Sequence, residues 1–303
     1  MQSGILLLNK PVGIRSTDCV TRVKRLFNEK TGHAGTLDST ACGLLVLLIG
    51  RATRLSDYVM LLPKVYTAVV SLGAETDTAD ASGEIVYSGN ADIINEAVVD
   101  SVLHNFLGAI MQVPPEISAI KVGGKAAHRI TRSMKKNNDK EREFSLPARP
   151  VFVHSIKRTS PVVNCEFEFE IRCGKGTYIR SIARDIGRVL GCGGHIKKLQ
   201  RLSVGNFSLA NACSIEELSL EGLLPIEIIG DYYHHIFLNN EAEKRLLNGL
   251  RVTLNDAGNY VTGEIDAPKN VAVIGETLFG FAEIKNDEEI PYLYPRINIK
   301  KNN

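Results

Sequence analysis

The sequence predicts a mixed α/β fold that ends in a small β-rich domain. Three observations support this prediction: one segment repeats apolar residues at helical spacing, another alternates apolar and polar residues, and the texture changes after about residue 230. The chain has 303 residues, of which 44% are hydrophobic and 23% charged, an ordinary globular composition. This length is enough for one large domain and one small domain.

The first predicted helix covers Ser16 to Phe27. Its apolar residues recur at helical spacing along the segment. Its first three residues, Ser16, Thr17 and Asp18, are of types that cap helix N-termini, so we expect the N-cap among them.

A strand followed by a helix is predicted in the middle of the chain. Residues Cys165 to Arg172 (CEFEFEIR) alternate apolar and polar side chains, so we expect Cys165 and every second residue after it to face a core. A glycine turn at 174–177 then opens a helix. Arg180, Arg184 and Arg188 recur every four residues on it and are predicted to form an arginine stripe on one face.

Two further segments define the expected domain organisation. Residues 133–147 are densely charged with few apolar residues, which predicts a surface loop. After about residue 230, short apolar runs such as Val271 to Ile274 alternate with glycines, which is typical of a small β-rich domain. We therefore expect a large domain at 1–230 and a small C-terminal domain at 231–303.

Charge is distributed in blocks along the chain. Residues 121–158 carry eleven Lys/Arg against three acids, and residues 172–201 carry eight against one. By contrast, residues 75–117 hold eight acids without any Lys or Arg, and residues 214–294 hold fifteen acids against five Lys/Arg. Two basic blocks on an otherwise acidic chain suit a protein that binds a polyanion with one face. Solvated loops and helix faces are the alternative interpretation.

Several classes of protein do not fit the sequence. Apolar stretches such as Gly43 to Gly50 are much shorter than the roughly 20 residues that span a bilayer, so we expect no membrane segment. The six cysteines lack paired CxxC spacing, which favours reduced thiols in a cytoplasmic enzyme.

Nucleotide and metal cofactors are not expected either. Neither the phosphate-binding GxxxxGK[ST] pattern nor GxGxxG occurs in the sequence. Cys192 and His195 have a metal-like spacing, but no second Cys/His pair accompanies them. A serine hydrolase is unsupported because no serine lies in a GxSxG motif.

The segment GHAGTLDSTACGLL at residues 32–45 is the strongest candidate for a site. Gly32 and Gly35 permit close approach of the backbone to a ligand, and Asp38 leads into an apolar run that would partly desolvate it. An aspartate followed by Ser-Thr is also typical of a helix N-cap, so both interpretations remain open at this point.

Separate motifs occur in a characteristic order along nearly the whole chain. They are Leu8-Asn9-Lys10-Pro11-Val12-Gly13, GHAGTLDSTACGLL at 32–45, Lys64-Val65-Tyr66, TDTADASGE at 76–84, Ser118-Ala119-Ile120-Lys121, KGTYIRSIARDIG at 175–187 and GCGGHIKKLQRL at 191–202. Through these motifs the sequence resembles the TruB-type tRNA pseudouridine synthases. The resemblance implies a pseudouridine synthase core with a central mixed sheet and an active-site cleft as the catalytic domain at 1–230. It also implies a small PUA-like, RNA-binding C-terminal domain at 231–303.

The resemblance also implies an activity. It is the isomerisation of a uridine in the T-arm loop of tRNA, at position 55, by base flipping and aspartate-dependent rearrangement of the glycosidic bond. Asp38 matches the catalytic carboxylate, and Arg180 matches the arginine that pairs with it. Tyr66 matches the tyrosine that stacks on the target base and assists removal of the C5 proton. No cofactor is required, because the reaction involves neither redox change nor hydrolysis.

Further positions match residues of the family that contact substrate. Each also has an ordinary structural interpretation, as a core side chain, a turn glycine or a solvated lysine. The expected roles are insertion into the vacated stack for His33, lining of the uracil pocket for Tyr178 and Leu199, phosphate contact for Lys10 and Lys121, and close backbone approach for Gly35.

The sequence departs from the family pattern beside the catalytic aspartate. Ser39 stands where proline is common, and Cys42 stands where threonine is usual. Both replacements are small, so we expect changed loop rigidity rather than lost chemistry.

Two other functions remain as alternatives. The first is a tRNA-binding folding chaperone with little dependence on turnover. The second, a glycosidase, would usually need a second carboxylate, which the motif loop lacks. For the synthase we expect tRNA as partner, no membrane and a monomer.

Overall fold

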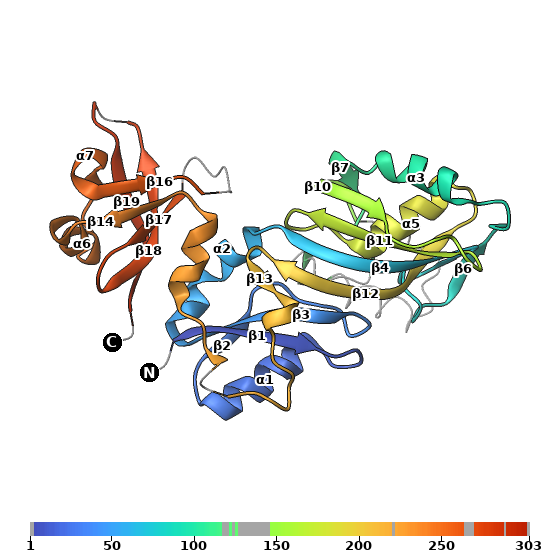
Figure 1. The fold of residues 1–303 in the computed structure, drawn as a ribbon, viewed down its shortest axis with the longest axis horizontal. Coiled ribbons are helices and arrows are strands. Elements are labelled where there is room, and N and C mark those ends of the chain that lie inside the picture. Colours follow the sequence, from blue (N-terminus) through green and yellow to red (C-terminus); the bar gives the residue numbers. More distant parts are fainter. Residues whose placement is uncertain are drawn as a thin grey trace. The chain divides into compact units, whose positions relative to one another are not determined.

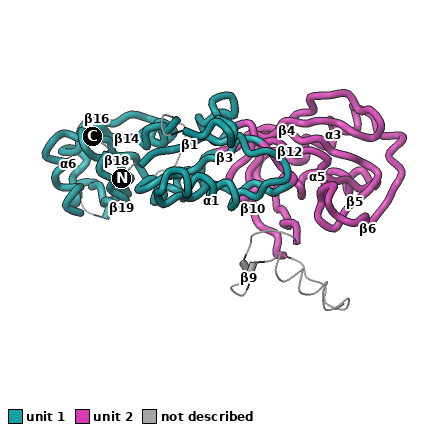
Figure 2. The backbone as a smooth tube through the Cα atoms, turned by 90° about the horizontal axis from the view of Figure 1, so that it is seen from below, with its two compact units in different colours: residues 1–39, 43–62, 203–303 teal, residues 40–42, 63–202 magenta. Residues whose placement is uncertain are grey.

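The computed structural model describes residues 3–116, 121–122, 125–126, 146–219, 222–263, 270–287 and 289–301. The chain forms two compact units (Figure 2). The first unit comprises residues 1–39, 43–62 and 203–303, and the second comprises 40–42 and 63–202. Helices and strands occur in both units, which confirms the mixed α/β prediction (Figure 1). Most of the loop predicted at 133–147 lies outside the described residues.

The first unit is built around two apolar strands. β1 (Gly4–Lys10) pairs antiparallel with β3 (Cys42–Ile49), and the short β2 (Thr31–His33) also pairs with β3. Helix α1 (Ser16–Phe27) has the predicted bounds. It packs Val23 and Phe27 against one face of these strands. Because β3 is buried on both faces, its sequence is a continuous apolar run rather than an alternation.

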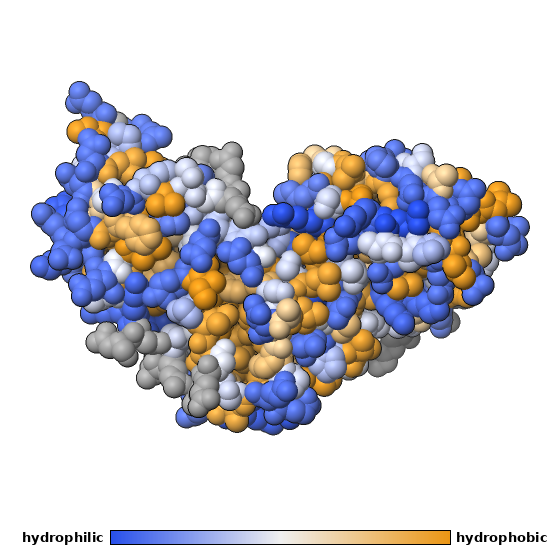
Figure 3. Space-filling model, viewed as in Figure 1, coloured by the Kyte–Doolittle hydropathy of each residue, from blue (hydrophilic) through white to orange (hydrophobic). Residues whose placement is uncertain are grey.

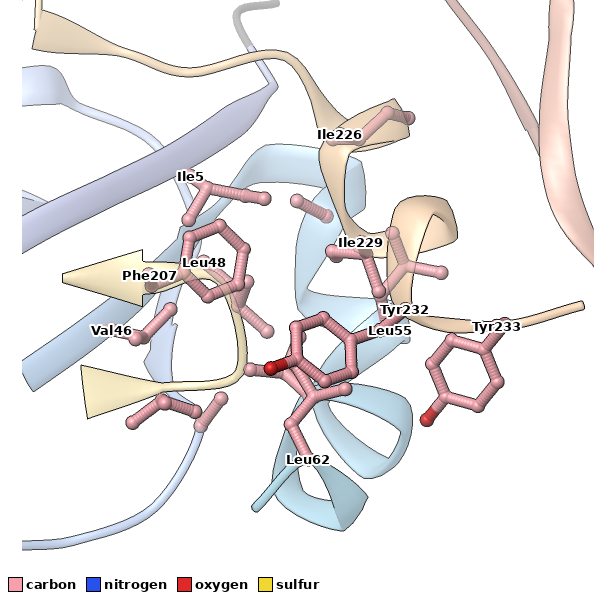
Figure 4. Packing of buried hydrophobic residues seen from close by; sticks show 14 of the residues in the cluster. Ile5, Val46, Leu48, Leu55, Leu62, Phe207, Ile226, Ile229, Tyr232 and Tyr233 are labelled. Atoms are coloured by element: carbon pink, nitrogen blue, oxygen red, sulfur yellow. The ribbon is translucent and has the colours of Figure 1, made fainter. Parts of the chain in front are cut away.

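The other face of β1 and β3 is covered by short helices, which create the core shown in Figure 4. Leu55 and Leu62 contribute from the segment that follows β3, and Phe207, Ile229 and Tyr232 contribute from the chain after residue 203. Truncating one such buried side chain to alanine typically costs about 2–5 kcal/mol of stability. The helical segments are η1 (Gly50–Leu55), α2 (Ser56–Leu61) and η4 (Ile226–Tyr232).

The C-terminal region forms a six-stranded sheet with the order β15-β19-β18-β17-β14-β16. This confirms the prediction that the region is rich in β-structure. One pair, β14 with β17, is parallel, and the other described pairs are antiparallel. The elements are β14 (His235–Leu238), α6 (Asn240–Leu247), β15 (Val252–Thr253), α7 (Leu254–Ala257), β16 (Gly258–Val261), β17 (Asn270–Ile274), β18 (Leu278–Lys285) and β19 (Tyr292–Lys300).

This C-terminal sheet shares a core with the N-terminal part of the same unit. The rings of Tyr58 and Phe281 stack with centroids 3.7 Å apart. The hydroxyl of the fully buried Tyr233 donates to the carbonyl oxygen of Tyr58 at 2.7 Å. Residues beyond the predicted boundary near Asp231 therefore pack directly on residues before it, and that boundary stays a prediction.

The second unit is a sheet with helices on one face. Its strand order is β12-β4-β11-β10-β7. Apolar residues of α3 and α5 pack with Phe167, Phe169 and Ile171 of β11 in a single core. The elements are β4 (Lys64–Leu72), α3 (Glu96–His104), β7 (Gly108–Gln112), β10 (Arg149–Arg158), β11 (Glu166–Cys173), α5 (Ile179–Val189) and β12 (Gly194–Val204).

Strand β11 has the predicted alternation, but it begins at Glu166, one residue later than predicted. Cys165 lies in the turn before the strand with φ +60°, and it packs partly buried against the same core as Phe167, Phe169 and Ile171. The opposite face of β11 is polar, and hydrophilic side chains gather over β10 and β11 in Figure 3. Glu166 pairs there with Lys197 at 2.5 Å, and Glu170 pairs with Lys157 at 3.5 Å.

None of the described helices is long and apolar enough to cross a membrane.

Four short strands and two further short elements complete the secondary structure. The strands form two hairpins, and the remaining elements are a strand that pairs with the end of β12 and a 3-10 turn. They are β5 (Ala74–Thr76) with β6 (Ile85–Ser88), β8 (Lys121–Val122) with β9 (Lys125–Ala126), β13 (Phe207–Ser208) and η2 (Leu209–Asn211).

Candidate active site

Asp38 is half-buried in the loop that connects β2 to β3. A turn and then a strand follow it, so the alternative that Asp38 caps a helix is wrong. Gly35 has φ +110°, a left-handed conformation that residues with a Cβ rarely adopt. The glycine is therefore required for the path of the loop, and a direct contact of Gly35 with substrate stays a prediction.

The backbone on both sides of Asp38 is tethered within the first unit. The Ser16 hydroxyl donates to the carbonyl oxygen of Leu37 at 2.8 Å and accepts from the Leu37 amide at 2.9 Å. The Gly13 amide donates to the Ser39 carbonyl oxygen at 2.7 Å. Ser16 was predicted as a helix N-cap, but the cap position of α1 is Arg15 and its side chain makes no cap hydrogen bond. The Ser16 hydroxyl is instead used by the loop.

A third tether follows Asp38 and involves Asp80. The Thr40 hydroxyl donates to Asp80 Oδ2 at 3.2 Å. Thr40 lies two residues after Asp38, and two residues of chain span at most about 7 Å, so the backbone of Thr40 is close to that of Asp38. Asp80 is 5% exposed and its Oδ1 accepts from Thr78 Oγ1 at 2.8 Å and from Ser82 N at 3.0 Å. The carboxylate thus connects the segment after Asp38 to the turn at 76–84.

Arg180 approaches the same Asp80 oxygen as Thr40 does, Oδ2. It is 4% exposed on α5, and its Nη1 donates to the Thr78 carbonyl oxygen at 2.8 Å. The same Nη1 lies 4.0 Å from Asp80 Oδ2, and both side chains are almost fully buried. Thr40, Asp80 and Arg180 therefore form one connected network, and Thr40 lies two residues after Asp38 in the chain.

The charge state of Asp80 follows from these contacts. Burial alone raises the pKa of a carboxyl group, but the hydrogen bonds from Ser82 and Thr78, with Arg180 nearby, outweigh it. The pKa of Asp80 consequently lies below its ordinary value, and the group is a carboxylate at neutral pH. Sequence reasoning missed this residue. The signal was a pair of aspartates, Asp77 and Asp80, among hydroxyl residues in the TDTADASGE segment.

The start of helix α5, which carries Arg180, is also clamped. The buried Gln112 side chain accepts from the Tyr178 amide at 2.8 Å and donates to the Tyr178 carbonyl oxygen at 3.1 Å. The guanidinium of Arg149 lies 5.3 Å from the centroid of the Tyr178 ring. These contacts fix the backbone two residues before Arg180. A role of the Tyr178 ring in the uracil pocket stays a prediction.

The predicted arginine stripe on α5 is wrong in one respect, because two of its three members are not displayed. Arg180 and Arg184 are buried, whereas Arg188 is exposed. Arg184 bonds to Asp185 at 2.8 Å and to the Val113 carbonyl oxygen at 2.9 Å. The period of four residues therefore places Arg180 and Arg184 in internal networks. The periodicity of the sequence cannot tell such a network from a solvated stripe.

Tyr66 and Leu199 lie at the edge of the second unit's core. Both are half-buried and pack against the same buried cluster. Cys42 approaches the Leu199 carbonyl oxygen with its Sγ at 3.7 Å, so the segment after Asp38 also contacts β12. The predicted stacking of Tyr66 on the base and the lining role of Leu199 stay predictions.

Two residues away from Tyr66, Lys64 is 7% exposed and close to the fully buried Arg201. Burial, with a smaller contribution from the Arg201 charge, lowers the pKa of Lys64 from 10.5 to about 7. This amine therefore changes charge near neutral pH. Sequence reasoning did not single it out beyond the motif that contains it.

The remaining predicted contacts lie in different surroundings. Lys10 is fully buried, and its Nζ donates to the carbonyl oxygens of Pro11 and Ile14 at 2.8 Å each. Its phosphate contact stays a prediction, one that these internal bonds do not favour. His33 is half-buried at the end of β2. The side chain of Lys121 lies outside the described residues.

Cys192 and His195 do not form a metal site with each other. His195 Nδ1 bonds to the Ala74 carbonyl oxygen at 2.9 Å, and the Cys192 thiol is buried against Gly193. Among the residues that the structure describes, no group of three or more His, Cys, Asp or Glu side chains could hold a metal ion.

Comparisons with known proteins identify similar sequences and folds. Residues 24–179 match the family "TruB family pseudouridylate synthase (N terminal domain)", and residues 180–224 match "tRNA pseudouridylate synthase B C-terminal domain". The chain is 38% identical over 279 residues to tRNA pseudouridine synthase B of Dehalococcoides mccartyi (strain CBDB1), covering 89% of this chain and 88% of that protein. It is 41% identical over 229 residues to the protein of the same name from Nitrosococcus oceani, covering 75% and 72%.

A solved structure described as "Crystal Structure of a Cbf5-Nop10-Gar1 Complex" contains a chain with a similar fold. The TM-score is 0.74 at 21% identity, covering 97% of this chain and 84% of that one. At this identity the similarity concerns the fold alone.

Proposed function

The chain belongs to the TruB family of pseudouridylate synthases, and we propose that it isomerises the uridine at position 55 in the T-arm loop of tRNA, with Asp38 as the catalytic carboxylate. The observation that carries this proposal is that Thr40, two residues after Asp38 in the chain, and Arg180 both contact the buried Asp80 carboxylate. A guanidinium with a fixed orientation is suited to orient a carboxylate, which is the role that the family resemblance gives to Arg180.

The chemistry requires a carboxylate and no external reagent. The N1–C1′ bond of the uridine breaks, the uracil turns while it remains bound, and a C5–C1′ bond forms. C5 then loses its proton and N1 gains one, so atoms and electrons balance without an oxidant or water. The Asp38 carboxylate acts on the reacting nucleotide during cleavage and holds the intermediate.

Arg180 orients this carboxylate, and Asp80 orients Arg180. A guanidinium has five N–H donors, so one side chain can bond to Thr78, pair with Asp80 and bind a further acceptor at the same time. We assign Asp80 a positioning role, because both of its carboxylate oxygens contact other groups of the protein.

The uracil is bound by groups of the second unit. The target base lies inside a folded loop and must be flipped out before reaction. Tyr66 stacks on the flipped base and assists loss of the C5 proton, while Leu199 and Tyr178 line the pocket. His33 fills the vacated stack. The PUA-like region at 231–303 contacts the RNA beyond the T-arm loop through its exposed side chains.

The test is the release of tritium from C5-labelled uridine in a tRNA transcript, combined with mapping of the modified position. The proposal predicts release from a single T-loop uridine. Release from a site outside the T loop would contradict the proposed substrate. If tRNA is refolded without any label release, the chaperone alternative is favoured instead.

A further inference from the structure

We propose that Ser16 is a positioning residue for Asp38, acting through the backbone of Leu37. The inference rests on the proposed catalytic role of Asp38 and adds a residue that touches no substrate. The Ser16 side chain is buried at the start of α1, where its hydroxyl contacts a residue 21 positions away in the chain.

The geometry fixes the peptide that leads into Asp38. A hydroxyl has one donor and two acceptor positions, and Ser16 uses both kinds on Leu37, at 2.8 Å to its oxygen and 2.9 Å from its amide. The Leu37 carbonyl belongs to the same planar peptide as the Asp38 nitrogen. The orientation of that plane sets the direction in which the Asp38 side chain leaves the backbone.

A second tether from the same segment holds the other side of Asp38. The Gly13 amide donates to the Ser39 carbonyl oxygen at 2.7 Å, and Gly13 adopts φ +90°. Ser16 thus holds the residue before Asp38, and Gly13 holds the residue after it. Ser16 begins helix α1, and Gly13 lies three residues before it; Cys19, Val23 and Phe27 of this helix are buried in the core. The loop is consequently supported by a packed element.

The expected consequence is a loss of rate rather than of affinity. A displacement of about 1 Å in a reacting group can cost about 100-fold in rate. Ser16→Ala removes both bonds to Leu37, so we expect a single-turnover rate at saturating tRNA about 10–100-fold lower, with the dissociation constant for tRNA within a few-fold of wild type. Exchange protection of the Leu37 amide should fall in the same variant.

The experiment compares Ser16→Ala with Ser16→Cys, Tyr233→Phe and Asp38→Asn. Ser16→Cys keeps a group of similar shape with a weaker donor, so we expect an intermediate loss of rate. Tyr233→Phe is the matched control, because it also removes a buried hydroxyl-to-carbonyl bond, of 2.7 Å, in the same unit. It should lower the unfolding midpoint and leave the rate unchanged.

Two outcomes overturn different claims. If both Ser16 variants react as fast as Tyr233→Phe while Asp38→Asn is inactive, the positioning role of Ser16 is wrong and the proposed function stands. If Asp38→Asn reacts at the wild-type rate, the proposed function itself is wrong. Should Ser16→Ala fail to fold, the rate of Ser16→Cys relative to Tyr233→Phe decides the question in the same way.

Discussion

Replacing Asp80 by asparagine tests the network of Thr40, Asp80 and Arg180 without changing the size of the side chain. In Asp80→Asn, the amide oxygen can still accept from Thr78 and Ser82, as the carboxylate does now. The amide nitrogen must then face Thr40 and Arg180, where it presents N–H groups to a cation. The variant therefore keeps the hairpin bonds and removes the negative charge opposite Arg180.

The structure sets the size of the effect. At 4.0 Å and an effective dielectric constant of about 20, the Coulomb attraction between Arg180 and Asp80 is about 4 kcal/mol. Arg180 keeps its bond to the Thr78 carbonyl oxygen, so part of its orientation survives. We expect about 2–3 kcal/mol of this attraction to appear as lost transition-state stabilisation, which is about 30–200-fold in rate.

The assay is the single-turnover rate of tritium release at saturating tRNA. Asp77→Asn is the control. Asp77 is a half-buried carboxylate in the same turn as Asp80, and it accepts a hydrogen bond from the Glu84 amide. The pKa of Asp80 is depressed in the folded protein, so its stabilising contribution is full above its unfolded pKa of about 3.9 and is lost as pH falls through the folded value. Asp77→Asn should react at the wild-type rate. If Asp80→Asn also reacts at that rate, the proposed role of Asp80 in orienting Arg180 is wrong.

Three further predictions follow from other contacts. Arg180→Lys should lower the single-turnover rate at least about 100-fold, because an ammonium cannot make the planar contacts of a guanidinium; an undiminished rate would remove Arg180 from the mechanism. The pKa of Lys64 is 10.5 in the unfolded chain and about 7 in the folded protein, so the contribution of Lys64 makes stability rise as pH increases between these values. The urea midpoint should therefore rise less between pH 6.5 and pH 9.5 in Lys64→Met than in wild type. Phe281→Ala should cost about 3–5 kcal/mol of unfolding free energy in urea titrations, because Phe281 is fully buried on Tyr58; a loss below about 1 kcal/mol would contradict the shared core.

Local patterns were sufficient to predict the elements that carry the site. The bounds of α1 followed from the spacing of its apolar residues, and β11 followed from strict alternation with an error of one residue. Both succeed because burial of one face imposes a period on the sequence. The candidate Asp38 came from the resemblance, since a lone Asp followed by Ser-Thr also fits a helix N-cap.

The contacts that organise the site could not be predicted in this way. Ser16 reaches Leu37 across 21 positions, and Thr40 reaches Asp80 across 40 positions. A serine at a helix start and an aspartate among hydroxyl residues have ordinary local explanations, so no local pattern distinguishes their distant roles. The change of texture near residue 230 likewise reports composition and cannot reveal that Phe281 packs on Tyr58.

The most direct test of the central claim is the single-turnover rate of Asp38→Asn on full tRNA, measured together with its dissociation constant. The asparagine keeps the size of the side chain and removes the carboxylate. If the Asp38 carboxylate is the catalytic group, the variant should show no detectable tritium release and a tRNA affinity within a few-fold of wild type, because most affinity for RNA comes from phosphate contacts. Release by the variant at a rate near wild type would contradict the assignment of Asp38 as the catalytic group.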